Sequence, residues 1–286
     1  MNSLSKKIIG KKRILAAIMI FIFVAILSKS VNELGVNYIA KQQEREKGIM
    51  IGAEPIFIQR NNDIGVLLIH GFTSSPGDFR ELANFLAEKN ITVYVPLLPG
   101  HGTHPKDLKE ISYQEWIDSV QQSLKLLDTK KRFVLGYSMG GTLALSLAER
   151  NDLEGVISIN SAIFLVNRYA PFIPLVRLVQ TYTAKKPEDI VYFINEKRVV
   201  YDSMPLKSVT EMQKLISTLQ LQKVTEPIII FQSDKDVIIK PESAYHIYST
   251  VSSEDKLLIS LENSTHNRLS NQEEAFSRVY KFILAH

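Results

Sequence analysis

The feature that most constrains the fold is a serine held between two glycines, in the stretch Gly136-Tyr137-Ser138-Met139-Gly140. The apolar residues 133–135 before it predict a short strand, and residues 142–149 after it are good helix formers. Small neighbours are needed because such a turn brings the strand and helix backbones close together. The pattern therefore predicts a strained turn with the positive end of a helix directed at the serine oxygen. The alternative is a serine in an ordinary strand–helix loop.

Short apolar runs alternate with helical patterns from residue 50 onward. Strands are predicted at residues 56–59, 66–69, 91–95, 133–135, 156–159, 228–231 and 257–261, and helices at 78–89, 112–128, 142–149, 241–250 and the C-terminus. Ser112 with Glu115, and Ser270 with Glu273, have the spacing of capping boxes at two helix starts. Strands that alternate with helices predict a mainly parallel sheet with helices on both faces.

The alternation stops between about residues 162 and 223, where four prolines and several short helical patterns lie between two predicted strands. We interpret this segment as an inserted cap. Residues 169–176 at its start are unusually apolar, and Phe172 and Ile173 in this run are candidate substrate contacts. Alternatively, these residues only pack the cap onto the core. A cap over the carboxyl ends of the strands would form one wall of a pocket at the edge where open α/β sheets bind ligands.

The first 47 residues differ in character from the rest. They carry a net charge of +6 while residues 48–286 carry −2, so this remainder has no excess of positive charge that would indicate nucleic-acid binding. Five Lys or Arg residues precede an uninterrupted apolar run at residues 14–27. This run is short for a membrane-spanning helix, which needs about 20 residues, and long enough for a signal-peptide core. Because apolar residues resume after Ser30 and no A-x-A pattern follows, residues 1–47 are interpreted as an uncleaved anchor and linker, with a cleaved signal as the alternative.

The charge pattern also predicts an orientation. The positive-inside rule places the N-terminus in the cytoplasm and the body, from residue 48 to 286, on the other side of the membrane. The chain has no cysteine, which excludes disulfides, thiolate catalysis and thiolate metal ligands.

A serine hydroxyl becomes a nucleophile when a base accepts its proton and an acid orients that base. On a sheet of this kind the acid and then the histidine follow the serine along the chain. His266 is the favoured base because it lies in a polar loop directly after a predicted strand, whereas His246 lies within a predicted helix and His286 ends the chain. Asp234 and Asp236 both follow the preceding strand, and composition does not separate them.

Acyl transfer also needs two main-chain N–H donors for the developing oxyanion. Met139, directly after the serine, is expected to supply one of them. Phe72, in the loop after the predicted strand at residues 66–69, is expected to supply the other. His70 in the same loop is interpreted as a histidine that braces the loop and not as a second base.

With these residues in place, the body resembles the α/β-hydrolase superfamily, and within it the bacterial monoacylglycerol lipases and short-chain carboxylesterases. The likeness covers about residues 50–286, including the cap, and the motifs that carry it lie at residues 68–73, 98–102, 136–141, 236–238 and 264–266. In that family the acid corresponds by position to Asp236. Residues 201–206 also look like a cap segment of the lipases. Thr265 departs from the pattern, since relatives often have glycine before the histidine.

The resemblance implies an α/β-hydrolase fold with an inserted cap, here preceded by a membrane helix. It also implies a serine hydrolase that forms an acyl-enzyme on Ser138, needs no metal or cofactor, and cleaves a carboxylic ester such as a monoacylglycerol. The alternatives are a small-ester carboxylesterase, a lysophospholipase or acyltransferase, and a non-catalytic hydrolase-like binding protein. The expected partners are a lipid or small ester substrate and the membrane; the sequence does not specify an oligomeric state.

Overall fold

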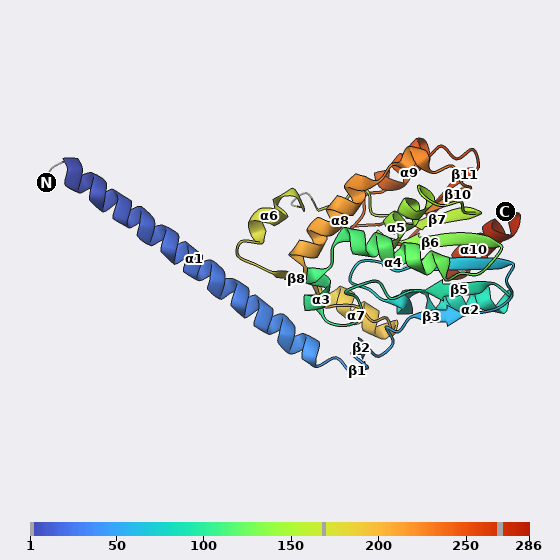
Figure 1. Ribbon diagram of the computed structural model, residues 1–286, viewed down its shortest axis with the longest axis horizontal. Coiled ribbons are helices and arrows are strands. Elements are labelled where there is room, and N and C mark those ends of the chain that lie inside the picture. The colour runs from blue at the N-terminus through green and yellow to red at the C-terminus, as the bar shows by residue number, and fades with distance from the viewer. Residues whose placement is uncertain (1–2, 168–169, 268–270) are drawn as a thin grey trace.

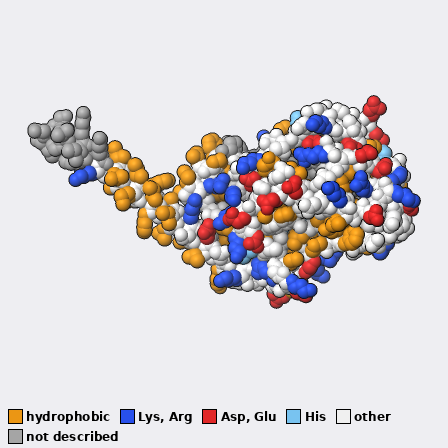
Figure 2. Space-filling view, viewed as in Figure 1, with side chains coloured by type: hydrophobic (Ala, Val, Ile, Leu, Met, Phe, Trp, Pro, Cys, Tyr) orange, Lys and Arg blue, Asp and Glu red, His pale blue; other side chains and the backbone are white. Residues whose placement is uncertain are grey.

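The computed structural model describes residues 3–167, 170–267 and 271–286. One long helix, α1 (Ser3–Lys41), extends away from a body built around a central sheet (Figure 1). The part of α1 from Lys12 to Lys41 is long and apolar enough to cross a membrane, as a membrane anchor or a signal sequence would be. Figure 2 shows its apolar side chains exposed beyond the body.

The central sheet has seven strands within the described residues, in the order β11-β10-β7-β6-β4-β5-β3. All neighbouring strands are parallel except β3, which pairs antiparallel with β5. The strands are β3 (Ile56–Ile58), β4 (Ile64–Ile69), β5 (Thr92–Val95), β6 (Lys131–Tyr137), β7 (Gly155–Ile159), β10 (Ile228–Ser233) and β11 (Lys256–Leu261). The central strands are almost fully buried, as expected for parallel strands covered on both faces.

Two apolar cores lie on opposite faces of this sheet. One is formed with α4 (Tyr113–Lys125), α5 (Met139–Ala148), α8 (Leu206–Thr218) and α9 (Glu242–Thr250). The other is formed with α2 (Arg80–Glu88) and α10 (Gln272–Ala285). The predicted parallel sheet with helices on both faces is therefore confirmed.

The two predicted helix starts have different outcomes. The capping box at α4 is present, since the Ser112 side chain accepts from the Glu115 main chain and the Glu115 carboxylate accepts from the Ser112 main chain. At α10 the capping side chain is Asn271, whose Oδ1 accepts from the main-chain N–H of Glu274 at 3.2 Å. Ser270, expected to cap this helix, lies outside the described residues.

The segment between β7 and β10, which we call the cap, contains several short elements. They are η2 (Ala170–Phe172), α6 (Ile173–Val176), β8 (Tyr182–Ala184), α7 (Pro187–Asn195), β9 (Ser203–Pro205), α8 and η3 (Leu221–Lys223). The two-stranded antiparallel sheet of β8 and β9 was not expected from the sequence, because three-residue strands are too short to show a periodic pattern.

Hydrogen bonds tie the cap to the loops at the carboxyl ends of the strands. The main-chain N–H of Tyr201 donates to the Thr73 carbonyl at 2.9 Å, and that of Val166 donates to the Ile238 carbonyl at 2.9 Å. The remaining short elements are η1 (Pro76–Phe79), α3 (Pro105–Glu110) and a small hairpin of β1 (Arg45–Glu46) and β2 (Ile49–Met50). This hairpin links α1 to the body.

Candidate active site

Ser138 lies at the sharp turn between β6 and α5. Its backbone has φ 56° and ψ −120°, a strained conformation that non-glycine residues rarely adopt. The turn is possible because its neighbours lack side chains: a Cβ atom on Gly136 would lie 2.0 Å from the Gly140 carbonyl oxygen, and one on Gly140 would lie 1.9 Å from that of Ile69. Because α5 begins at the next residue, its N-terminal main-chain N–H groups surround the serine.

Three side chains from distant parts of the chain form one hydrogen-bonded row. His266 Nε2 lies 3.0 Å from Ser138 Oγ, and His266 Nδ1 lies 2.7 Å from Asp236 Oδ2. All three residues are buried. A neutral imidazole in this row, with its proton on Nδ1, presents a lone pair to the serine hydroxyl, which is the arrangement a general base requires.

The two aspartates after β10 have different surroundings. The second carboxylate oxygen of Asp236, Oδ1, accepts hydrogen bonds from the main-chain N–H groups of Ile238 and Ile239, both at 2.8 Å. The carboxylate is therefore held toward the imidazole. Asp234 is exposed, and its Oδ1 accepts from the main-chain N–H of Ser264 at 3.1 Å. The structure thus brings Asp236 to His266 and places Asp234 in the support of the histidine loop.

The loop after β4 lies directly beside the serine. A Cβ atom on Gly71 would be 3.5 Å from the Cβ atom of Ser138. Among the described residues, the main-chain N–H groups of Phe72 and Met139 have no hydrogen-bond partner. Phe72 flanks Ser138 in space and Met139 flanks it in sequence, so both N–H groups are free to donate hydrogen bonds to an oxyanion.

His70 braces this loop. The main-chain N–H of Leu98 donates to His70 Nε2 at 3.1 Å, and His70 Nδ1 lies 3.0 Å from the Gly71 carbonyl. Burial lowers the pKa of His70 to about 4, so the ring is neutral at physiological pH. With both ring nitrogens engaged by the main chain, this histidine is structural, as the sequence analysis proposes.

A cavity of about 400 Å³ lies between the serine and the cap. Ser138, Phe72 and His266 line it together with apolar residues, among them Leu165, Ile173, Val209 and Met212. Of the two candidate substrate contacts, Ile173 lines this cavity. Phe172 does not: its side chain is exposed on the outer surface of the cap.

An arginine of the cap connects the cavity wall to the histidine loop. Arg198 donates to the Asp78 carboxylate at 2.8 Å and to the Asn267 carbonyl at 2.9 Å, directly after His266. The Asp78 carboxylate also accepts from Ser74 Oγ at 2.5 Å, near the start of the loop that carries Phe72. One largely buried guanidinium therefore links the cap, the loop before η1 and the histidine loop around the serine. The sequence gives no signal for this contact, because its partners are far apart along the chain.

A second set of contacts fixes the carbonyl of the histidine itself. The Tyr137 hydroxyl, in the residue before the serine, donates to the His266 carbonyl. The Tyr192 hydroxyl of the cap donates to the Asn267 carbonyl at 3.1 Å. Burial raises the pKa of Tyr137, so its hydroxyl remains a donor at all physiological pH values. The described residues contain no cluster of three or more His, Asp or Glu side chains that could hold a metal ion.

The strand order, the strained serine turn and the inserted cap define the class of this protein, which is an α/β-hydrolase. The chain belongs to the family described as "Serine aminopeptidase, S33", whose sequence model matches residues 60–273.

Two relatives and one solved structure place the chain within this class. It is similar to a "Thermostable monoacylglycerol lipase" from Bacillus sp. (strain H-257), with 33% identity over 76% of this chain and 88% of the relative. A "Carboxylesterase" from Bacillus subtilis is 26% identical over 79% of this chain and 95% of the relative. A solved structure of the metagenome-derived lipolytic enzymes LipS and LipT has a TM-score of 0.76 at 27% identity, and the match covers 83% of this chain and all of that one.

Proposed function

We propose that Ser138, His266 and Asp236 form the catalytic triad of a carboxylic ester hydrolase. The observation that carries the proposal is the row of two hydrogen bonds at 3.0 and 2.7 Å. His266 takes the proton of Ser138 Oγ as the oxygen attacks the ester carbonyl carbon. The protonated imidazole then gives that proton to the leaving alcohol, and the acyl group stays on the serine. Water, activated by the same histidine, attacks the acyl-enzyme and releases the acid.

The main-chain N–H groups of Phe72 and Met139 stabilise the oxyanion that forms in both steps. Removing one such donor typically costs about 10²–10³ in rate. Asp236 keeps the imidazole in the required tautomer and stabilises its charged form. No step of this reaction needs a metal or a cofactor.

The preferred substrate is a monoacylglycerol or a similar single-chain lipid ester. Three observations support this choice: the names of the similar proteins, the apolar lining of the cavity beside the serine, and the helix α1, which is long and apolar enough to cross a membrane. A small-ester carboxylesterase would share the same triad, and a profile of activity against acyl chain length distinguishes the two.

The decisive variant is Ser138→Ala. We expect it to lower kcat by about 10⁴-fold or more toward p-nitrophenyl esters and monoacylglycerols, as in other enzymes of this mechanism. Labelling by a fluorophosphonate probe should also be lost. Ser249→Ala, on the outer helix α9, is the matched control and should behave as the wild type. Full activity in the Ser138→Ala variant would contradict the mechanism.

The N-terminal segment is proposed to be an uncleaved anchor with the body outside the cytoplasm. The single apolar stretch of α1 and the five basic residues before it support this arrangement.

A further inference from the structure

The second half of α1 is docked onto the cap and is not a free tether. The carboxamide of Asn32 makes three hydrogen bonds with the start of β8. Its Oδ1 accepts from the main-chain N–H groups of Thr181 at 3.2 Å and Tyr182 at 2.7 Å, and its Nδ2 donates to the Tyr182 carbonyl at 3.2 Å. A side chain that satisfies three main-chain groups fixes both the position and the rotation of the helix.

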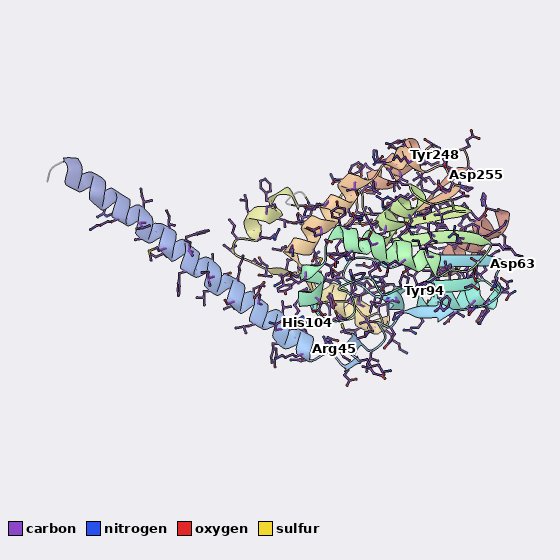
Figure 3. The ribbon with its side chains drawn as sticks, viewed as in Figure 1. Arg45, Asp63, Tyr94, His104, Tyr248 and Asp255 are labelled. Atoms are coloured by element: carbon purple, nitrogen blue, oxygen red, sulfur yellow. The ribbon has the colours of Figure 1, made fainter. Side chains whose placement is uncertain are left out.

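Charged and polar neighbours reinforce this contact. Glu33, one residue further, accepts from Thr181 Oγ1 at 3.1 Å and lies 3.6 Å from Lys109 Nζ of α3. Beyond the end of α1, Arg45 of β1 donates to the Thr103 carbonyl at 3.0 Å (Figure 3 shows Arg45 and His104 beside this end of the helix). The helix and the strand that follows it are thus attached to the body at two separate places.

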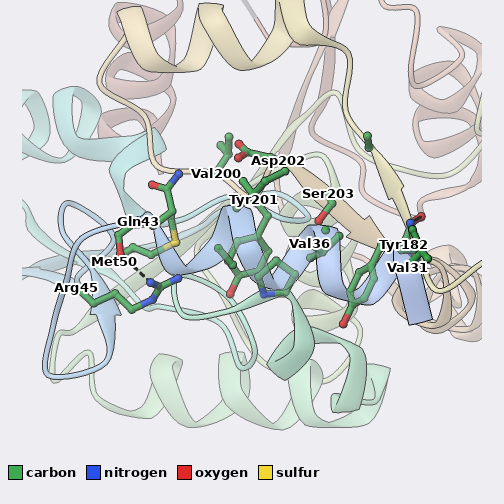
Figure 4. A pocket seen from close by; sticks show the side chains of 16 residues that line it. Val31, Val36, Gln43, Arg45, Met50, Tyr182, Val200, Tyr201, Asp202 and Ser203 are labelled. Carbon is green, nitrogen blue, oxygen red and sulfur yellow. Dashed lines mark hydrogen bonds between the residues drawn. The ribbon is translucent and has the colours of Figure 1, made fainter. Parts of the chain in front are cut away.

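Between these attachments the helix and the β8–β9 strands of the cap enclose a pocket of about 230 Å³. Figure 4 shows its lining, with Val31 and Val36 of α1 near Tyr182 of β8 and Ser203 of β9. The same pair of strands also lines the catalytic cavity, through Ala184 and Met204. The anchor helix therefore touches the element that forms the wall of the active site.

The cap presents an exposed apolar surface close to the point where α1 leaves the body. Phe172, Leu175, Val176 and Leu178, which we call the cap tip, are 55%, 64%, 40% and 55% exposed. Arg177 lies among them. Exposing four neighbouring apolar side chains to water is unfavourable, so a surface of this kind marks a contact with an apolar partner.

Residue spacings along the chain give the position of the cap tip along the axis of α1. The apolar run of α1 ends at Leu27, five residues or about 7.5 Å along the helix before Asn32. Leu178 is three residues from Thr181, which Asn32 contacts, and so lies within about 11 Å of it. Figure 1 shows α6 on the side of β8 that faces the N-terminal end of α1. The tip consequently lies level with the end of the apolar run, where a spanning helix crosses the bilayer surface.

We propose that α1 is a rigid strut which holds the cap tip in the bilayer surface, so that the tip docks on lipid. This inference rests on the proposed membrane anchoring of α1. Apolar side chains with an arginine among them suit the boundary between acyl chains and anionic headgroups. The wall of the catalytic cavity is thereby held against the membrane, and a lipid ester can pass from the bilayer to Ser138 without crossing water.

The absence of cysteine makes a direct test possible with single labelled cysteines in the full-length protein. Leu175→Cys places an environment-sensitive fluorophore on the tip, and Leu257→Cys places it on β11, an exposed position on a strand at the far edge of the sheet. The proteins are reconstituted in vesicles of phosphatidylethanolamine and phosphatidylglycerol, with a nitroxide quencher on the headgroup of some lipids. We expect blue-shifted, quenched emission at position 175 and aqueous emission at position 257.

The strut is tested by adding Asn32→Ala to the Leu175→Cys protein, with Leu34→Ala, an exposed position of α1 outside the pocket, as the matched control. Asn32→Ala should reduce the quenching and lower kcat/KM toward vesicle-borne monoacylglycerol about tenfold, the effect of about 1.4 kcal/mol. Hydrolysis of a soluble p-nitrophenyl ester should be unchanged, which shows that the variant is folded.

Two results would overturn the proposal. If emission at position 175 is not quenched by the nitroxide on the lipid headgroups, the tip does not dock on lipid. This holds even where contact with a second copy of the chain shifts the emission. Quenching that persists in the Asn32→Ala protein means that α1 is not the strut. Neither result affects the proposed ester hydrolysis, which fails only if activity on the soluble ester is independent of Ser138.

Discussion

The aspartates at positions 234 and 236 are chemically identical and differ only in their contacts. Asp236 faces the imidazole, while Asp234 supports the loop that carries it. We expect Asp236→Asn to lower kcat by about 10⁴-fold, because an amide stabilises the wrong tautomer of His266. Asp234→Asn keeps an oxygen acceptor for the Ser264 N–H and should retain nearly full activity. Steady-state kinetics on one p-nitrophenyl ester compare the pair, and equal losses would argue against this assignment of the acid.

Burial of His70 predicts a dependence of stability on pH. Its pKa is about 4 in the folded protein against 6.5 for an exposed histidine, so the unfolded chain binds more protons between these values. The contribution of His70 to the free energy of unfolding is fully present above pH 6.5. It falls by on the order of 3 kcal/mol as the pH drops toward 4.

Chemical denaturation in detergent at a series of pH values measures this effect. His70→Asn should show a smaller loss between pH 6.5 and 4 than the wild type. Some dependence should remain, because burial also lowers the pKa of His101, whose ring packs against His70 at 5.0 Å between centroids. Parallel pH profiles for the two proteins would show that His70 does not contribute.

Among the elements, the cap and the histidine loop are coupled through Arg198. We expect Arg198→Met to shift the loop after β11 and lower kcat about 10–100-fold, since small displacements of catalytic groups have effects of this size. It should also destabilise the fold by about 3–5 kcal/mol, because the buried Asp78 carboxylate loses its charged partner.

A double variant separates these two effects. Adding Asp78→Asn removes the unpaired charge and should recover much of the stability, while the activity stays low because the bond to the Asn267 carbonyl is still missing. Lys197→Met, at the exposed neighbouring position, is the control. Recovery of activity together with stability would indicate that Arg198 acts only on the fold.

At the scale of the whole molecule, the charge asymmetry of the chain predicts its orientation. In spheroplasts of a bacterial host, a membrane-impermeant maleimide should react with Leu126→Cys, an exposed position on the body. Ser5→Cys, which precedes the apolar run, should react only after lysis. The reverse pattern would contradict the proposed topology, and a mature chain lacking its first residues would favour the cleaved signal.

Local patterns predicted the parts of the fold that depend on neighbours in sequence. The glycines at 136 and 140 indicated the turn at Ser138, the position of His266 after a strand indicated the base, and alternating elements indicated a parallel sheet. Short elements such as α3 and the two-stranded β8–β9 sheet were missed, because a few residues carry no periodicity and are stabilised by their surroundings.

The sequence by itself determined the class of fold, the serine, the histidine and the presence of an apolar N-terminal helix, because each depends on residues close together along the chain. Composition left Asp234 and Asp236 open, the family resemblance indicated Asp236, and the tertiary structure brings Asp236 to His266. Only the tertiary structure showed that Arg198 joins the cap to the catalytic loops and that Asn32 fixes α1 to β8. These contacts join residues 30 to 150 positions apart. Their partners are chosen by how strands and loops pack in space, and no local pattern records that choice.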